Sequence, residues 1–393
     1  MTGQGVSGIR YVYLDHAATT PPHPEVAKAM QPYLEEKFGN PSALYAIGRE
    51  TREAIEDSRK KIASLIGAST DEIYFTSGGS ESDNMALAGA LIANKDSGNH
   101  IVTTEIEHHA VLATAQFLSN HGYEATFVGV DSKALVDPEA IKKAIKTGTV
   151  LVSVMQANNE VGTIEPLREI AEVCREAGVC LHTDAVQTVG NIPVDVDELD
   201  VDLLSMSGHK LYGPKGVGAI YIRKGTRISR FIHGGEQERG MRAGTENIAG
   251  IAGLGVAAEM AAAEMGAKVE RIKALRNRLI EGLTGSTDDI YLNGHPEKRL
   301  PNNAHFGVKF IEGEAVCLQL DTFGIFASTG SACSSEALEP SHVLLAMGVP
   351  ARDAQGSVRF SLGRATTDED VDYVIEKFPP VVARLRSMSP LAR

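Results

Sequence analysis

Basic residues are in the minority in this sequence of 393 residues. It has 38 lysines and arginines against 51 aspartates and glutamates, so the formal net charge is −13. No run or stripe of lysine and arginine stands out, and nucleic-acid binding depends on such clustered positive charge. We therefore expect no nucleic-acid partner.

Long apolar runs are also missing. No apolar stretch approaches the roughly 18–20 residues that cross a membrane. The N-terminal text MTGQGVSGIRYVYLDHAATTPP lacks the apolar core of a signal peptide. We expect a cytoplasmic protein without a membrane partner.

Cysteine is scarce, and the four residues at 174, 180, 317 and 333 form neither a CxxC pair nor a zinc-binding spacing. In a reducing cytosol they are expected to be free thiols. Cys180 and Cys317 are flanked by apolar residues, which predicts core packing. Cys333 lies in the small polar run STGSACSSEALEPSH, which predicts an exposed thiol on a loop.

The two best-known nucleotide-binding motifs are absent as well. No G-x-G-x-x-G is present, and TSGGSES (76–82) is not followed by GK[ST]. The small residues of TSGGSES lie between an expected strand and an expected helix. Two interpretations remain open: Ser80 caps the helix, or free backbone N–H groups at the helix N-terminus hold a phosphate.

What the sequence does contain is a regular alternation of strands and helices from about residue 70. Short β-branched runs alternate with segments of helical periodicity, which predicts a mainly parallel sheet covered on both faces. The pattern changes near residue 264. We predict a large domain over residues 15–263 and a smaller α/β domain formed by residues 1–14 with 264–393.

Polar residues follow several of the expected strands directly. Because ligands bind beyond the carboxyl ends of parallel strands, these residues are expected to converge on one site. They are Ser77–Ser80, Glu107–His109, Asn158–Glu160, Asp184–Gln187 and Ser207–Lys210.

Lys210 stands in SMSGHKLYGPKGVG, between two apolar runs of strand length. It is either a solvated loop lysine, as most lysines are, or a nucleophile of the Schiff-base type. Asp184 of HTDAVQ either caps a helix or holds a proton on the ring nitrogen of a cofactor. A lysine, an aspartate and a Gly/Ser phosphate loop together are what pyridoxal 5'-phosphate (PLP) requires.

The chain resembles the cysteine desulfurases of the NifS/IscS type almost from end to end. The motifs that carry the resemblance are YLDHAATTPP (13–22), TSGGSESDN, EHHAV, NNEVGT, HTDAVQ, SGHKLYGPKG, QERGMRAGT, GSACSS and RFSLGR (359–364). The resemblance implies PLP-dependent transferase fold type I. In that fold a large domain carries a mainly parallel sheet in an α/β/α sandwich, and a smaller C-terminal α/β domain follows.

The resemblance also implies roles for individual residues. The catalytic residues would be Lys210, which binds PLP covalently and moves the substrate Cα proton, Cys333, and His108, which stacks on the ring. The remaining PLP-binding residues would be Gly79, Ser80, Asp184, Gln187, Ser207, His209 and Thr245. Because Thr245 would reach the phosphate of a neighbouring subunit, a homodimer is implied. His109 is interpreted as a helix-surface residue.

Asn159 and Arg359 match positions that grip the substrate carboxylate, a task that suits a bidentate arginine. A buried structural ion pair is the alternative for Arg359. The implied reaction removes sulfur from L-cysteine, leaves L-alanine, and forms a persulfide on Cys333. The sulfur then passes to an acceptor such as an iron–sulfur scaffold protein. Cys333 is also a candidate ligand of a transient [2Fe–2S] cluster.

Other functions would fit parts of the same pattern. A selenocysteine lyase or another class-V PLP aminotransferase would use the same cofactor site, and an aminotransferase would not need Cys333. A non-catalytic partner of an iron–sulfur scaffold would be colourless. A dinucleotide-binding oxidoreductase is disfavoured because the glycine fingerprint is missing.

Overall fold

A seven-stranded sheet forms the centre of the larger lobe of the computed structural model, which describes residues 10–330 and 340–390. The strand order is β2-β8-β7-β6-β5-β3-β4. Within this sheet β8 runs antiparallel to both of its neighbours, and the other pairs are parallel. The prediction of a mainly parallel sheet is confirmed. The strands are β2 (Ile73–Thr76), β3 (His100–Thr104), β4 (Glu124–Val128), β5 (Thr149–Ser153), β6 (Cys180–Asp184), β7 (Leu203–Ser207) and β8 (Gly218–Ile222).

Helices cover both faces of this sheet because the central strands are apolar on both faces. Successive strand residues point to opposite sides, so Ile101 packs in one core cluster and Val102 in the other. The first cluster is closed by α3 (Gly79–Ala93) and α4 (His109–Ser119). The second is closed by α5 (Pro138–Ala144), α6 (Leu167–Ala177), α7 (Val196–Leu199) and part of α8 (Ile248–Ser286). The result is an α/β/α sandwich, as the sequence predicts.

The smaller lobe has its own core, to which the N-terminal strand contributes. Val12 and Leu14 pack there with Phe306, Phe360 and Phe378. The lobe holds an antiparallel sheet of β11 (Ile290–Leu292), β12 (Asn303–Val308) and β14 (Ser357–Ser361), and a parallel pair of β1 (Val12–Tyr13) and β13 (Ile325–Phe326). Its helices are α9 (Gly313–Asp321), α10 (His342–Ala346), α11 (Ala351–Ala354) and α12 (Asp368–Met388). The predicted boundary after residue 263 falls inside the continuous helix α8, so it stays a prediction.

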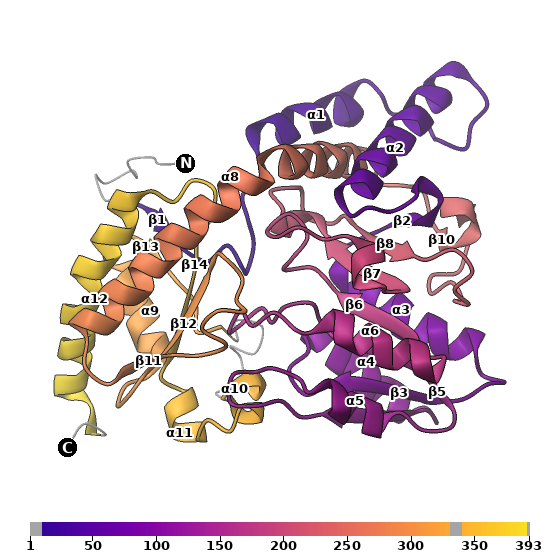
Figure 1. The fold of residues 1–393 in the computed structure, drawn as a ribbon. Helices are drawn as coiled ribbons and strands as arrows, with labels where there is room; N and C mark the ends of the chain where they lie inside the picture. The colour runs from indigo at the N-terminus through magenta and orange to yellow at the C-terminus, as the bar shows by residue number, and fades with distance from the viewer. Residues whose placement is uncertain (1–9, 331–339, 391–393) are drawn as a thin grey trace.

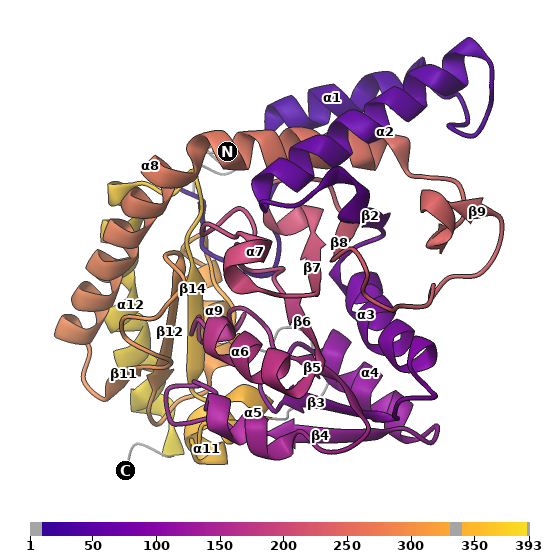
Figure 2. The ribbon, with the colours of Figure 1, turned by 45° about the vertical axis from the view of Figure 1, so that its right-hand side comes forward.

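Helix α8 bridges the two lobes and carries α1 (Pro24–Glu35) and α2 (Ala46–Leu65) on its N-terminal half (Figures 1 and 2). By length and composition alone α8 is apolar enough to cross a membrane, so the expectation that no stretch approaches a membrane span is wrong for this helix. Here its apolar residues pack in the protein instead: Leu254 lies in the core of the larger lobe and Leu279 in that of the smaller one. Core helices of this kind satisfy the same test of length and composition.

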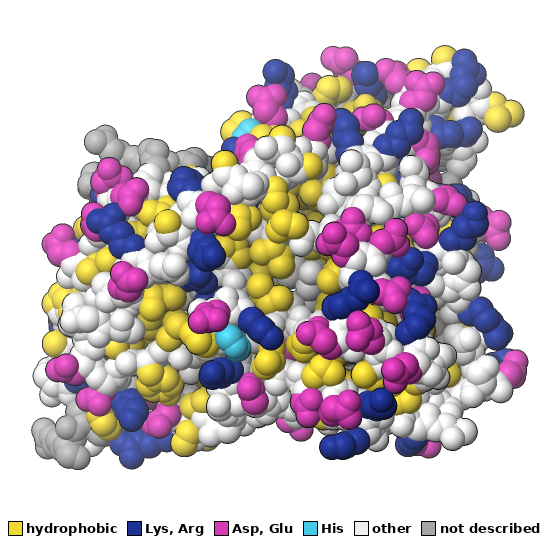
Figure 3. Space-filling view, in the orientation of Figure 1, with side chains coloured by type: hydrophobic (Ala, Val, Ile, Leu, Met, Phe, Trp, Pro, Cys, Tyr) yellow, Lys and Arg dark blue, Asp and Glu magenta, His cyan; other side chains and the backbone are white. Residues whose placement is uncertain are grey.

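The remaining elements are short. Strands β9 (Glu236–Gln237) and β10 (Arg242–Ala243) form an antiparallel pair, and 3₁₀ turns span Thr70–Glu72, Gly208–Lys210 and Glu238–Gly240. Acidic and basic side chains are interspersed over the face seen in Figure 3, and hydrophobic side chains gather in its centre, where the two lobes meet.

Candidate active site

A cavity of about 290 Å³ lies at the carboxyl ends of the parallel strands, where the smaller lobe meets the larger one. Its lining comes from eight separate segments of the chain, which the topology brings together at one edge of the sheet. The lining residues are Ala17, Ala18, Gly79, Ser80, Asp83, His108, Met155, Asn159, Asp184, Val186, Gln187, Ser207, His209, Lys210, Gly330 and Arg359.

Ten of the twelve site residues that the sequence predicts line this one cavity. The other two are Thr245 and Cys333. Thr245 is exposed and does not line the cavity of its own chain. Cys333 and the rest of residues 331–339 lie outside the described residues, so the predicted nucleophile has no structural account here.

Lys210 reaches the cavity from the 3₁₀ turn that directly follows β7. Its amine donates hydrogen bonds to the backbone carbonyls of Ala17 and Ala18, the latter at 2.7 Å. Gln187 donates to the same carbonyl of Ala17 at 3.0 Å. The N-terminal segment therefore holds two of the predicted PLP-binding side chains from the same side.

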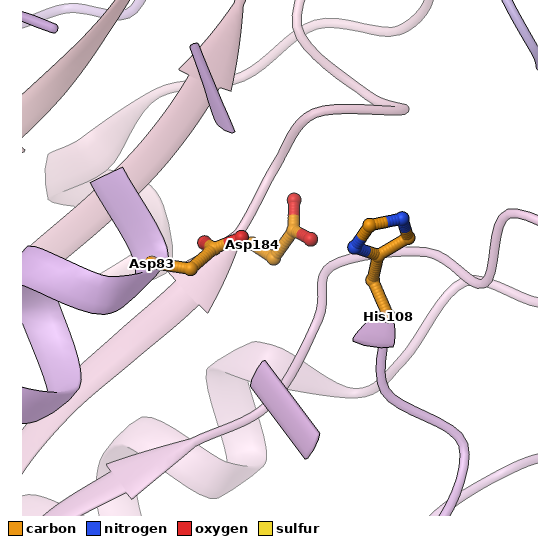
Figure 4. Close-up of side chains that lie close together, drawn as sticks. All are labelled: Asp83, His108 and Asp184. Carbon is orange, nitrogen blue, oxygen red and sulfur yellow. The ribbon is translucent and has the colours of Figure 1, made fainter. Parts of the chain in front are cut away.

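Asp184 ends β6 and lies between Asp83 and His108 (Figure 4). Donor atoms of the three side chains lie within 4.8 Å of one another. One carboxylate oxygen of Asp184 accepts from the backbone N–H of Val186 at 2.9 Å. Burial raises the pKa of Asp184, and the nearby His108 imidazole opposes that rise.

His108 caps α4, where its Nδ1 accepts from the N–H of Ala110 at 3.1 Å. Burial lowers the pKa of His108, and the charge of the nearby Asp184 opposes that fall. Its neighbour His109 is exposed, as interpreted from the sequence, and its ring lies 4.8 Å from that of His342. The sequence thus distinguishes the cavity-lining histidine from the surface one.

The first turn of α3 forms the part of the cavity that suits a phosphate. The interpretation of Ser80 as the helix cap is wrong, because α3 begins at Gly79 and its N-cap residue is Gly78. Gly78 has no side chain, so no side-chain cap occupies the first N–H groups of the helix. A Cβ atom at Gly79 would lie 2.7 Å from Cγ2 of Val186, which shows how closely the backbone approaches the wall of the cavity. Free N–H groups at a helix N-terminus bind anions.

Ser207 and His209 lie beside this turn. Burial and the nearby Lys210 charge lower the pKa of His209 to about 4, and its Nδ1 pairs with the Thr19 hydroxyl at 3.1 Å. The cavity therefore offers an anion site, a lysine amine and a buried carboxylate. These donors fit the phosphate, the aldehyde and the ring nitrogen of PLP respectively.

Arg359 reaches the cavity from β14 of the smaller lobe and is 2% exposed. Its guanidinium makes an ion pair with Asp15 at 2.8 Å and donates to the backbone oxygens of Asn159 at 2.8 Å and Gly330 at 3.2 Å. Its Nε has no hydrogen-bond partner among the described residues. The buried ion pair proposed as the alternative role is present, and the side chain lines the cavity as well.

The described cysteines are free thiols that lie away from the cavity lining. Cys174 is buried in the core on α6, and Cys317 is partly buried against the core of the smaller lobe. Burial raises the pKa of each to about 12, so neither is a ready nucleophile. Cys180 is partly buried against the other cluster of the larger lobe, which agrees with the expected core packing.

Asp83 is an ionisable residue of the cavity lining that the sequence did not predict. It is 1% exposed on α3, and its Oδ1 lies 3.7 Å from Nε2 of His182 without a hydrogen-bond partner among the described residues. Burial, reinforced by the charge of Asp184, raises its pKa well above the usual range. The available signal was an aspartate at the start of the apolar helical run MALAGALIA.

Comparisons with known proteins identify the family of the chain. The family model described as aminotransferase class-V matches residues 12–374. The cysteine desulfurase IscS of Dictyoglomus turgidum is 55% identical over 97% of this chain and 97% of its own length. The cysteine desulfurase IscS of Methanosarcina thermophila is 53% identical over 97% of this chain and 94% of its own length.

Two solved structures have the same fold. A NifS-like protein superposes with a TM-score of 0.90 at 39% identity, covering 95% of this chain and 100% of that one. A structure of SspA in complex with cysteine superposes with a TM-score of 0.80 at 34% identity, covering 89% of this chain and 98% of that one.

Proposed function

The chain belongs to the class-V aminotransferase family and is a cysteine desulfurase, and on this basis we propose how its own residues carry out that reaction. A cysteine desulfurase is a PLP-dependent sulfurtransferase that takes sulfur from L-cysteine and leaves L-alanine. One observation carries the proposal: Lys210, Asp184 and the first turn of α3 line a single cavity.

We propose that PLP is held by its phosphate at Gly79, Ser80, Ser207 and His209, and by its ring at Asp184, Gln187 and His108. When bound, PLP supplies an electron sink for the negative charge that forms on the substrate Cα. Asp184 offers an anion toward the position of the ring nitrogen, which favours the protonated form of that nitrogen. In this proposal Lys210 takes the Cα proton and returns it, since its amine lines the cavity together with Asp184 and Gln187.

Asn159 and Arg359 bind the substrate carboxylate in this proposal. The ion pair between Arg359 and Asp15 supports it, because a guanidinium fixed in orientation loses little freedom when a carboxylate binds. Cys333, outside the described residues, accepts the substrate sulfur: its thiolate forms the new S–S bond as the Cβ–S bond breaks.

Two experiments test these assignments. Borohydride reduction of the holoenzyme should trap a cofactor adduct on Lys210, and Lys210→Ala should lose it. Cys333→Ser should stay yellow but form less alanine from L-cysteine by at least about 100-fold. An adduct on another lysine contradicts the first assignment, and full activity of Cys333→Ser contradicts the second.

We also propose that the protein is a homodimer in which Thr245 completes the phosphate site of the partner subunit. The exposure of Thr245 supports this. So do apolar side chains exposed in the connection between α1 and α2, among them Phe38 (73% exposed) and Leu44 (84% exposed). Sedimentation should give a dimer, and Thr245→Ala should release PLP faster. A monomer that retains PLP contradicts the proposal.

The sulfur acceptor is proposed to be an iron–sulfur scaffold protein, with a transient [2Fe–2S] cluster ligated by Cys333 as a further step. Transfer of ³⁵S from labelled L-cysteine to a purified scaffold protein tests the first part, with Cys333→Ser as the control.

A cytoplasmic location is proposed too, and the free thiols at 174, 180 and 317 support a reducing compartment. Cell fractionation tests it.

A further inference from the structure

Tyr212 adopts a left-handed backbone conformation, with φ of 63°, two residues after Lys210. For a bulky residue this conformation is an outlier, and it persists only where surrounding contacts hold it. Tyr212 is buried at 9% exposure, so its ring has such contacts. The turn places Lys210 at the cavity and the Tyr212 ring against other elements.

Those elements reach the ring from the part of the chain assigned to the smaller domain. The ammonium of Lys268 on α8 lies 5.2 Å from the ring centroid, and the guanidinium of Arg364 lies 5.8 Å from it. Both distances are in the range of cation–π attraction. The backbone N–H of Arg364 also donates to the Tyr212 hydroxyl at 2.8 Å.

The backbone of Tyr212 holds the N-terminal segment that also receives Lys210. Its N–H donates to the Thr20 hydroxyl at 2.9 Å, and its carbonyl accepts from His23 at 2.9 Å. The carbonyls of Ala17 and Ala18, in the same segment, accept from the Lys210 amine. Displacement of Tyr212 would therefore move the acceptors of the lysine amine.

Lys268 also connects the Tyr212 ring to the segment that carries Gln187, another residue of the cavity lining. Its ammonium donates to the Gly190 carbonyl at 2.8 Å and to the Asn191 side chain at 3.2 Å. Asn191 in turn donates to the carbonyl of Gln187 at 3.1 Å.

We propose that Tyr212 is a positioning residue that couples the smaller lobe to Lys210. Its ring, held by Lys268 and Arg364, maintains the turn that aims the lysine amine into the cavity. The proposal goes beyond the assigned reaction but rests on Lys210 being the residue that binds PLP.

The test compares two substitutions in the holoenzyme. Tyr212→Gly accepts the left-handed conformation without strain but removes the ring, whereas Tyr212→Phe keeps the ring. We expect Tyr212→Gly to lower kcat about 10- to 100-fold and Tyr212→Phe to stay close to the parent. The pH at which the visible absorption of bound PLP changes should shift in Tyr212→Gly by at least ~0.5 unit. Ala134→Gly is the matched control, since it relieves another left-handed residue that does not line the cavity.

A second pair of variants keeps the proposal testable if Tyr212→Gly folds poorly. Arg364→Gln removes one of the two cations over the ring. Its control Glu264→Gln keeps both cations and removes the carboxylate that pairs with Arg364 at 3.0 Å. We expect the absorption transition to shift in Arg364→Gln and not in Glu264→Gln.

Any one of three results overturns the proposal. The first is that Tyr212→Gly folds and keeps both the parental kcat and the parental pH of the absorption change. The second is that Tyr212→Phe loses as much kcat as Tyr212→Gly, and the third is that Arg364→Gln leaves the pH of the absorption change unmoved. Borohydride trapping in the parent protein distinguishes failure of the Tyr212 proposal from failure of the proposed function. An adduct on a different lysine would show that Lys210 does not bind PLP.

Discussion

Asp83 and Asp184 place two buried carboxyl groups at one end of the cavity, with oxygens no more than 4.8 Å apart. Two unit charges at that distance repel by about 3 kcal/mol at an effective dielectric constant near 20. The pair therefore holds one proton. Asp83 is the group that keeps it, because burial raises its pKa well above the usual range, whereas His108 counteracts the rise at Asp184.

The first prediction follows from this division. Asp184→Asn should lower alanine formation by at least about 100-fold, because it removes the anion that we propose favours the protonated ring nitrogen of PLP. Asp83→Asn replaces one neutral polar group with another and should cost less than about fivefold. Alanine formation and the visible spectrum of the holoenzyme at pH 7 measure both effects. Equal losses in the two variants would show that Asp83 carries charge.

Among the ionisable residues of the cavity, the sequence predicts Asp184 and Lys210, which lie at or just after the ends of strands. It misses Asp83, which lies on α3. Asp184 and Lys210 are found because parallel strands end at one edge of the sheet, so position along the chain fixes position in space. Asp83 lies five residues after Gly78, and whether its side chain meets β6 depends on the rotation of α3 over the sheet. That rotation is set by packing of the whole helix, which no local pattern reports.

At the scale of elements, α8 is held against α2 by glycine. A Cβ atom at Gly255 would lie 2.8 Å from the Cα of Ser58, so the two helix backbones approach too closely for any larger residue. A Cβ atom at Gly266, further along the same helix, would meet nothing within 4 Å.

These two positions give the second prediction. Gly255→Ala should lower the free energy of unfolding by about 1–3 kcal/mol, because the helices must separate. Gly266→Ala should raise it by about 0.5–1 kcal/mol, because alanine favours the helix and space is available. Denaturant unfolding of the holoenzyme measures both. A stabilising Gly255→Ala would mean that α2 and α8 are further apart than the structure has them.

The sequence predicts the existence of most elements but not the continuity of α8. The text from residue 245 onward is compatible with one long helix or two, and the structure has a single helix, Ile248–Ser286. It stays unbroken because its two halves are buried in different cores, with Leu254 in one and Leu279 in the other. The cores are formed by distant segments, so the helix length depends on tertiary packing.

At the scale of the whole molecule, the pH dependence of stability is set in part by buried carboxyl groups and buried imidazoles. Burial raises the pKa of Glu107 and that of Glu165 from 4.5 to about 8. Burial lowers the pKa of His182 and that of His305 from 6.5 to about 3. The native state therefore holds neutral carboxyl groups and neutral imidazoles through most of the acidic and neutral range.

The two kinds of group act in opposite directions as pH changes. Below pH 6.5 the unfolded chain binds protons at the imidazoles that the native state excludes, so their contribution to stability rises with pH up to about 6.5. From pH 4.5 to about 8 the unfolded chain releases protons that the native carboxyl groups keep, so their contribution falls with pH. Above pH 6.5 the carboxyl groups act alone among these four residues.

The third prediction is a fall in the melting temperature of the holoenzyme between pH 6.5 and 8. Each buried carboxyl group contributes about 2 kcal/mol to that fall, from a difference of about 1.5 pH units. Glu165→Gln should make the fall smaller by a few degrees. The variant keeps an oxygen that can accept a hydrogen bond from the backbone N–H of Val136, as Oε2 of Glu165 does at 2.9 Å.

Glu169→Gln, at an exposed position on the adjoining helix α6, is the control and should leave the parental pH profile unchanged. If Glu165→Gln and Glu169→Gln give the same profile as the parent, Glu165 is ionised in the native state and its burial does not destabilise the protein at alkaline pH.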